Sequence, residues 1–381
     1  MSTPVVLQYF EAMNKAEASD LYLTVGFPPS MRTEKGVEKI TGSPLTIEEI
    51  NEIIATILTN RQRRQYEAEM ELNTSLDVGE YGRYRVNIMR QRQNPALVLR
   101  RIISQIPTFN ELKLPEMLGT LALEKRGLIM VTGQTGSGKS TTLASMIEHR
   151  NQRQEGHIIT IEDPIEYFYE HKKSIISQRE VGVDTESYAV ALKNSLRQRP
   201  DVILVGEIRD REVMEQALTA SETGHLCLST LHTSNAYQSI ERTVNMFPEE
   251  YHEQIRLNMA MNLKAIISQR LVPTIDGSLT VAIEIMLNKG LIKELIHKGE
   301  ISKIRPIMEQ NNQFGMCTFD QSFFWLYTQG KITEETALAN SDQPGDLKIK
   351  IQNYDLGGEE AAQEGQSALN RIDTSLLSVS D

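Results

Sequence analysis

The chain has 381 residues, of which 40% are hydrophobic and 24% are charged, and its formal net charge is −11. This length predicts two domains with a linker or tail, and the composition excludes a chain that is disordered throughout or collagen-like. The acidic balance argues against a protein that binds nucleic acid through a generally basic surface, so no direct nucleic-acid partner is expected.

The first hundred residues predict a small α+β domain. The expected elements are a helix at 4–18, a strand at 20–25, a helix from 46 and a strand at 82–89. Thr46 and Glu49 have the spacing of a capping box, which predicts that the helix begins there. In the strand at 82–89 apolar residues alternate with Arg83 and Arg85, so both arginines are expected on one face.

From residue 126 onward predicted strands alternate with predicted helices, a pattern typical of an α/β domain with a mostly parallel sheet. The expected strands are 127–132, 157–161, 202–205 and 226–230. The expected helices are 139–150, 185–197, 211–223 and 255–271, with further helices after them. The predicted organisation is an N-terminal domain at 1–100, a linker at 101–114, a second domain at 115–340 and an acidic, flexible tail at 341–381.

The cysteine count and the apolar runs indicate a cytoplasmic protein. Cys227 and Cys317 are the two cysteines, too few for a disulfide framework or a four-cysteine zinc module. The first twenty residues lack the basic start and uninterrupted apolar stretch of a signal peptide. The longest apolar runs are far shorter than the roughly 18 to 20 residues that cross a bilayer. Any membrane contact is therefore expected to be indirect.

The clearest motif is a phosphate-binding loop, G-x-x-x-x-G-K-[ST], that follows an apolar strand and opens a helix. Its predicted nucleotide-binding residues are Gly133, Gln134, Thr135, Gly136, Ser137, Gly138, Lys139 and Ser140, followed by Thr141. Glycines turn backbone N–H groups toward phosphates, Lys139 supplies a cation for the β and γ phosphates, and the Ser140 hydroxyl ligates Mg²⁺. The predicted cofactors are ATP and Mg²⁺.

Two acidic motifs follow at the ends of predicted strands. The first, 162–166, holds three carboxylates, of which Glu166 is expected to orient or deprotonate the water that attacks the γ-phosphate. The second is the strand 202–205, which has the form of a Walker B site. Gly206 stands where many nucleotidases carry an aspartate, so Glu207 is the nearest acid able to serve the metal, through water. A solvated acidic loop and an ordinary terminal acid are the alternative interpretations.

His225 and His232 flank the last of these strands and form a histidine box. A histidine at a strand end can sense the γ-phosphate, while satisfied surface histidines are the alternative. Cys227 lies between the two histidines, but no fourth ligand is evident, so a zinc site is not favoured.

These four motifs, in this order, resemble the secretion ATPases of type II secretion, type IV pilus and type IV secretion systems. Over about residues 5–340 the chain looks like the pilus retraction ATPases of the PilT/PilU family. The stretches that carry this resemblance are 18–23 with Gly26, Pro28, Pro29 and Arg32, then 83–87, 178–180 and 223–225. The stretches 290–300 and 316–323, with the acidic tail, look more like the PilU branch.

The resemblance implies a RecA-like ATPase domain with a PAS-like N-terminal domain, assembled as a homo-hexamer. It implies ATP hydrolysis that powers or assists pilus retraction and twitching motility, as an accessory motor beside a PilT-type ATPase and an inner-membrane platform protein. It assigns catalytic roles to Glu166, Glu207, His225 and His232. Arg83 and Arg85 could then reach a nucleotide as arginine fingers, although arginines on an exposed strand face are common.

Two further alternatives stay open from the residues. The chain could act as a nucleotide-bound coupling subunit that relays force in a PilT ring without its own hydrolysis; a DNA-translocating motor is disfavoured by the acidic balance. The aromatic stretch 316–327 could bind a partner or could be an ordinary core helix.

Overall fold

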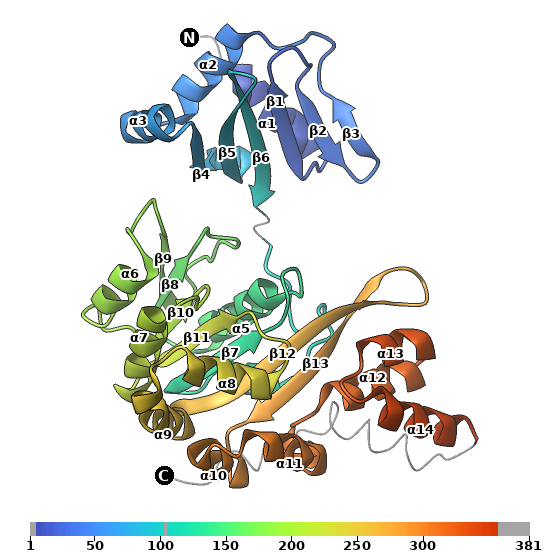
Figure 1. The fold of residues 1–381 in the computed structure, drawn as a ribbon. Helices are drawn as coiled ribbons and strands as arrows, with labels where there is room; N and C mark the ends of the chain where they lie inside the picture. The colour runs from blue at the N-terminus through green and yellow to red at the C-terminus, as the bar shows by residue number, and fades with distance from the viewer. Residues whose placement is uncertain (1–4, 103–104, 357–381) are drawn as a thin grey trace. The chain divides into compact units, whose positions relative to one another are not determined.

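The computed structural model describes residues 5–102 and 105–356. These residues form two compact units. The first unit runs to Gln105 and also includes Pro164–Phe168; the second unit contains the other described residues. Each unit has its own sheet, as Figure 1 shows. In the part of the chain that is described, no helix is long and apolar enough to cross a membrane.

The first unit is an antiparallel six-stranded sheet in the order β3-β2-β1-β6-β5-β4. Its strands are β1 (Asp20–Thr24), β2 (Ser30–Thr33), β3 (Gly36–Lys39), β4 (Glu71–Asp77), β5 (Arg83–Gln91) and β6 (Asn94–Ile102). Its helices are α1 (Val5–Lys15), α2 (Ile47–Ile57) and α3 (Asn60–Glu69), with the 3-10 turn η1 (Gly79–Tyr81). The helices pack their apolar faces on the sheet to make a separate core.

The first unit contains the predicted capping box at Thr46 and the predicted alternation of side chains in β5. The backbone N–H of Glu49 donates to Thr46 Oγ1 at 3.2 Å, and the Thr46 N–H donates to Glu49 Oε2 at 2.8 Å, so the capping box is confirmed. In β5, Tyr84 is buried while Arg83 and Arg85 are half-buried on the other face. Strand β6 was not predicted, because its hairpin turns at Arg92 and Gln93, which have positive φ but are not the Asn-Gly type of turn.

The second unit is a mixed seven-stranded sheet in the order β13-β12-β7-β11-β10-β8-β9, parallel except for the pair β12 and β13. Its strands are β7 (Gly127–Thr132), β8 (Gly156–Glu162), β9 (Ser174–Glu180), β10 (Val202–Val205), β11 (Leu226–Leu231), β12 (Leu263–Pro273) and β13 (Leu279–Leu287). The predicted α/β class is thereby confirmed, with a smaller antiparallel α+β unit before it.

Helices cover both faces of this sheet, α5 on one and α6, α7 and α9 on the other, and α4 packs on α5 (Figure 1). The helices are α4 (Met117–Ala122), α5 (Lys139–Arg153), α6 (Tyr188–Ser195), α7 (Arg211–Glu222), α8 (Ala236–Asn245), α9 (His252–Asn262), α10 (Leu291–Lys298), α11 (Ile304–Gln310), α12 (Phe319–Thr328), α13 (Glu334–Asn340) and α14 (Pro344–Asp355). The 3-10 turns are η2 (Glu249–Tyr251), η3 (Ile301–Lys303) and η4 (Asn312–Phe314).

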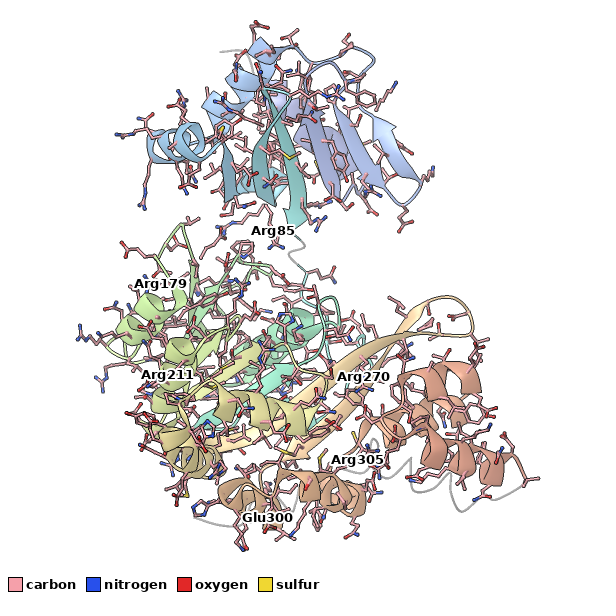
Figure 2. All side chains as sticks on the ribbon, in the orientation of Figure 1. Arg85, Arg179, Arg211, Arg270, Glu300 and Arg305 are labelled. Atoms are coloured by element: carbon pink, nitrogen blue, oxygen red, sulfur yellow. The ribbon has the colours of Figure 1, made fainter. Side chains whose placement is uncertain are left out.

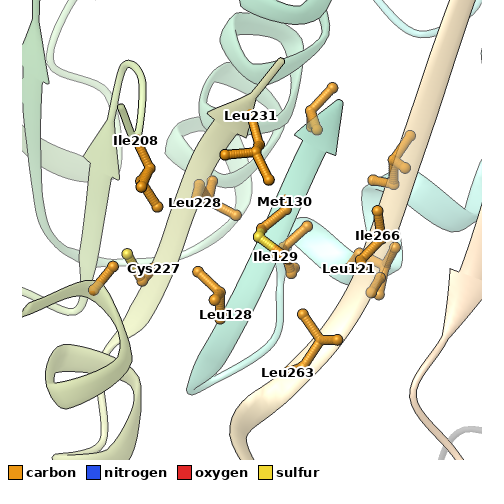
Figure 3. Close-up of a cluster of buried hydrophobic side chains, with 14 of the residues drawn as sticks. Leu121, Leu128, Ile129, Met130, Ile208, Cys227, Leu228, Leu231, Leu263 and Ile266 are labelled. Carbon is orange, nitrogen blue, oxygen red and sulfur yellow. The ribbon is translucent and has the colours of Figure 1, made fainter. Parts of the chain in front are cut away.

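The core of the second unit centres on β7, which is buried along its whole length. Figure 3 shows Ile129 and Met130 of β7 with the strands that flank it: Leu228 of β11 pairs with Ile129, and Ile266 of β12 pairs with Met130. A strand buried on both faces reads as a continuous apolar run. This is why β7, β10 and β11 were predictable from the sequence.

The predicted helix at 255–271 is wrong in its second half. Helix α9 ends at Asn262 and β12 begins at Leu263, and the later strand β13 was also expected to be helical. β12 lies between β7 and β13. Because both of its faces are largely buried, its sequence lacks the alternation that marks a strand, and periodicity cannot distinguish it from a buried helix.

The predicted flexible tail begins too early. Residues 344–355 form α14, and its Leu347 and Ile351 are buried in a cluster with Phe323 and Phe324 of α12. The tail prediction is therefore wrong for α14, because two apolar residues one turn apart supply a packing face. The aromatic stretch 316–327 is mainly core, and the remaining tail, 357–381, lies outside the described residues.

Candidate nucleotide site

The predicted phosphate loop joins the end of β7 to the start of α5. Gly133 has φ +148°, and a Cβ there would lie 2.5 Å from both Gln269 O and Ser137 Oγ. Gly136 and Gly138 have φ +79° and +88° with no described atom within 4 Å of an added Cβ. Gly133 is therefore required both by the close approach of other atoms and by its backbone conformation. Gly136 and Gly138 are required by backbone conformation alone.

The donors of this loop suit a phosphate ligand. Lys139 is 8% exposed, and its Nζ donates to Gly133 O at 2.9 Å and to Gln134 O at 2.8 Å. The buried Ser137 Oγ has no hydrogen-bond partner among the described residues. Ser140, on the first turn of α5, is exposed. A helix N-terminus, a lysine, hydroxyls and a glycine cradle fit the phosphates and magnesium of a nucleotide.

Glu207 is the centre of a second cluster beside this loop. Its Oε1 lies 3.0 Å from His232 Nε2, and Arg209 Nε donates to its Oε2 at 2.7 Å. Arg209 Nη1 also lies 3.9 Å from Asp163 Oδ2. Glu207, His232 and Asp163 follow the carboxyl ends of β10, β11 and β8, which meet at one edge because the strands are parallel.

The pKa of His232 depends on Lys139 of the phosphate loop as well as on Glu207 of this cluster. Burial lowers the pKa of His232, and the positive charge of Lys139 lowers the same pKa further, whereas Glu207 acts in the opposite direction. The neutral imidazole is therefore favoured. Lys139, Glu207 and His232 thus lie at one place although they are far apart in sequence.

The structure does not bring His225 into this cluster. His225 precedes β11 and His232 follows it, so a strand separates them by roughly 20 Å at the usual rise per residue. His225 Nδ1 lies 3.1 Å from Ala220 O and 3.2 Å from Thr223 Oγ1. The predicted γ-phosphate sensing by His225 does not fit this position, which is at the amino end of the strand. Cys227 is a buried core thiol whose pKa burial raises to about 12.

Glu166 belongs to the segment 164–168 of the first unit. Its Oε1 lies 3.8 Å from Arg85 Nη1, with both side chains more than a third exposed. Arg83 places its guanidinium carbon 3.5 Å from the centre of the Phe168 ring, and its Nε donates to Asp77 Oδ2 at 2.7 Å. Both arginines therefore have partners in their own unit.

Comparison with known proteins identifies the family. Residues 59–304 match the type II/IV secretion system proteins. The type IV pilus ATPase PilU of Pseudomonas aeruginosa is 49% identical over 345 residues, which cover 90% of each chain. The pilus retractation ATPase PilT of the same organism is 39% identical over 330 residues, 87% of this chain and 96% of that one. The chain belongs to the PilT/PilU family of type IV pilus ATPases.

A solved structure of this family agrees with the fold. The crystal structure of the pilus retraction motor PilT with bound ADP matches with a TM-score of 0.85 and 41% identity, covering 90% of this chain and 99% of the other. The predicted resemblance, including its leaning toward PilU, is confirmed.

Sequence reasoning missed two residues of this PilT/PilU-type site. Arg209 joins two acidic motifs, and the only sequence signal for it is its position two residues after Glu207. Tyr188 faces Gly206: a Cβ added at Gly206 would lie 3.0 Å from the Tyr188 hydroxyl. The glycine in the Walker B strand thus leaves room for a tyrosine from α6, which nothing in the local sequence indicates.

Proposed function

We propose that this chain hydrolyses Mg–ATP at residues 133–141 together with Glu207 and His232, and that hydrolysis powers or assists pilus retraction as a PilU-type accessory motor. The proposal is supported by the meeting of the phosphate loop, Glu207 and His232 at one edge of a parallel sheet. The bound ADP named for the related PilT structure supports a nucleotide ligand.

Each residue has a proposed role. The glycine cradle and the start of α5 bind the phosphates, Lys139 neutralises their charge, and Ser140 with Glu207 holds Mg²⁺, Glu207 through water. The ion supplies electrostatic stabilisation of the phosphoryl group when it is bound. His232 contacts Glu207 as a neutral imidazole and keeps it oriented. Arg209 Nε donates to the second carboxylate oxygen of Glu207 and fixes that oxygen in place.

Glu166 remains the proposed catalytic glutamate that orients the attacking water. Its pairing with the half-exposed Arg85 is of the kind that contributes little stability, so exchange of this partner costs little. Arg83 and Arg85 remain proposed nucleotide contacts, in the same chain or from a neighbour.

The remaining proposals concern organisation. We propose an N-terminal domain at 1–100, a linker at 101–114 and a second domain at 115–340 that the packed helix α14 extends to residue 355, in a homo-hexamer in the cytoplasm. Its proposed partners are a PilT-type ATPase and an inner-membrane platform protein, which gives the motor its indirect contact with the membrane.

The test is ATP turnover by the purified full chain. We expect Lys139→Ala to lower kcat by about 10²-fold or more, because the lysine charge acts on the phosphates throughout the reaction. Lys193→Ala removes an exposed lysine of α6 and should leave turnover unchanged. Equal turnover by wild type and Lys139→Ala would refute hydrolysis at this site.

A further inference from the structure

Glu284 of β13 is a buried carboxylic acid that the proposed chemistry does not use. It is 4% exposed, and its Oε1 accepts hydrogen bonds from the Ala236 backbone N–H at 2.7 Å and from Ser268 Oγ at 3.2 Å. Ser268 Oγ in turn accepts from Thr132 Oγ1 at 3.1 Å. Thr132 and Ser268 are fully buried.

One end of this hydrogen-bond row is the phosphate loop. Strand pairing aligns Thr132 with Ser268, and Ser268 with Glu284, so the three side chains cross three adjacent strands. Thr132 is the last residue of β7 and directly precedes Gly133. One peptide unit therefore connects the hydrogen-bond row to the phosphate loop.

The other end is the segment that carries His232. Ala236 is the first residue of α8, and Asn235 caps that helix through its side chain. From the same helix Arg242 Nη1 donates to His232 O at 2.8 Å. The position of α8, which Glu284 holds at its first turn, therefore sets the position of His232.

The charged groups that face Glu284 come from two other segments. Arg270 of β12, labelled in Figure 2, pairs with Asp342 at 2.6 Å, and its Nη2 also donates to Ser234 O at 3.3 Å. Burial raises the pKa of Glu284 to about 7. The charge of Asp342 also raises this pKa, whereas the Ala236 N–H, Ser268 and Arg270 lower it. The carboxyl group thus changes charge near neutral pH.

We propose that Glu284 is a positioning residue that joins the phosphate loop to the His232 segment, and that its ionised form holds the two in the arrangement that hydrolyses ATP. This rests on the proposed ATP hydrolysis. A carboxylate accepts hydrogen bonds about twice as strong as those of a neutral acceptor, so ionised Glu284 holds the first turn of α8 more firmly than the protonated acid does.

The first test is the pH profile of kcat for the full chain between pH 6 and 8. Glu284→Gln keeps the shape and one acceptor oxygen but stays neutral. We expect wild-type kcat to rise about fivefold across this range and the variant to stay near the acid-side value, with KM for ATP changed less than about twofold.

A matched pair of serine variants distinguishes the effect of Ser268 on Glu284 from the general effect of removing a buried hydroxyl. Ser268→Ala removes a donor to the carboxylate, so the wild-type rise should move to higher pH. Ser195→Ala removes a buried hydroxyl that donates within α6, to Ala191 O, and should leave the profile in place.

The second test does not depend on hydrolysis. Calorimetry of ADP binding at pH 7, in buffers of different ionisation enthalpy, counts protons exchanged on binding. We expect wild type to release a fraction of a proton that Glu284→Gln does not release. Folded Glu284→Gln with the wild-type pH profile and proton count would overturn the role of Glu284. Equal turnover by wild type and Lys139→Ala would instead refute hydrolysis, and the proton count would still decide the coupling.

Discussion

Gly206 directly follows the Walker B strand β10 and faces the side chain of Tyr188 from helix α6. A Cβ at this position would lie 3.0 Å from the Tyr188 hydroxyl, 3.3 Å from Ile161 O and 3.4 Å from Glu162 Cα. An aspartate would need still more room. The metal-serving acid is therefore proposed one residue later, at Glu207, which Arg209 and His232 hold by both carboxylate oxygens.

Gly206→Ala should lower the free energy of unfolding by about 1 to 2 kcal/mol, and Tyr188→Phe should reduce that cost, because the clash involves the hydroxyl. Urea unfolding of the two single variants and the double variant measures the coupling.

The control for this cycle is Gly345→Ala, whose added methyl group has no described atom within 4 Å. We expect it not to destabilise the protein. A cost of Gly206→Ala that is the same with and without the Tyr188 hydroxyl would contradict the explanation.

Helix α14 illustrates how an element depends on its partners. Its composition is polar, yet Leu347 is 1% exposed and Ile351 is fully buried against α12. Tyr354 also contacts Phe324 edge to face, with ring centroids 5.9 Å apart. The helix therefore closes the aromatic cluster that the β12–β13 hairpin and α12 begin (Figure 1).

Leu347→Ala should lower the free energy of unfolding by about 2 to 4 kcal/mol, since it opens a cavity in this cluster. Ile349→Ala, on the same helix, removes a side chain that is 58% exposed and should cost less than about 0.5 kcal/mol. Urea unfolding followed by the fluorescence of Trp325, the single tryptophan, measures both. Equal costs would show that α14 does not pack as described.

For the whole molecule, the parallel sheet is what assembles the chemistry. Strands β7, β8, β10 and β11 end at one edge, so loops from residues 133 to 232 deliver the phosphate loop, Asp163, Glu207 and His232 to one place. Strands β12 and β13 extend the sheet beyond β7. Ser268 of β12 contacts Thr132, which precedes the phosphate loop, and Glu284 of β13 contacts Ala236 at the start of α8. Under the proposed roles, the phosphate loop binds the nucleotide and Glu207 with His232 serves hydrolysis, so mutation should separate binding from hydrolysis.

The separation of nucleotide binding from hydrolysis can be tested with a variant of Glu207. Glu207→Gln should lower the ATP turnover of the purified protein by about 10²-fold or more while ADP affinity changes less than about threefold, because the phosphate loop is intact. Glu212→Gln, an exposed acid of α7, is the control. Turnover and calorimetric ADP binding measure the two effects.

The same variant distinguishes a motor from a coupling subunit. If the protein is an accessory motor, the Glu207→Gln variant should weaken pilus retraction in cells that keep an active PilT-type ATPase. Full retraction in that background would favour the coupling-subunit alternative, in which bound nucleotide is sufficient.

The sequence by itself determined the features that are local along the chain: the capping box at Thr46, the buried strands of the parallel sheet, the phosphate loop at 133–141 and the family. These depend on spacing and on residues close to each other in sequence. Only the tertiary structure decided that His225 lies at the far end of β11, that β12 is a strand and that α14 is packed. It also decided that Arg209 contacts Glu207, that Tyr188 faces Gly206 and that Glu284 contacts Ala236 of α8. Each of those depends on a neighbour from a distant segment, and sheet order, which no local pattern encodes, supplies that neighbour.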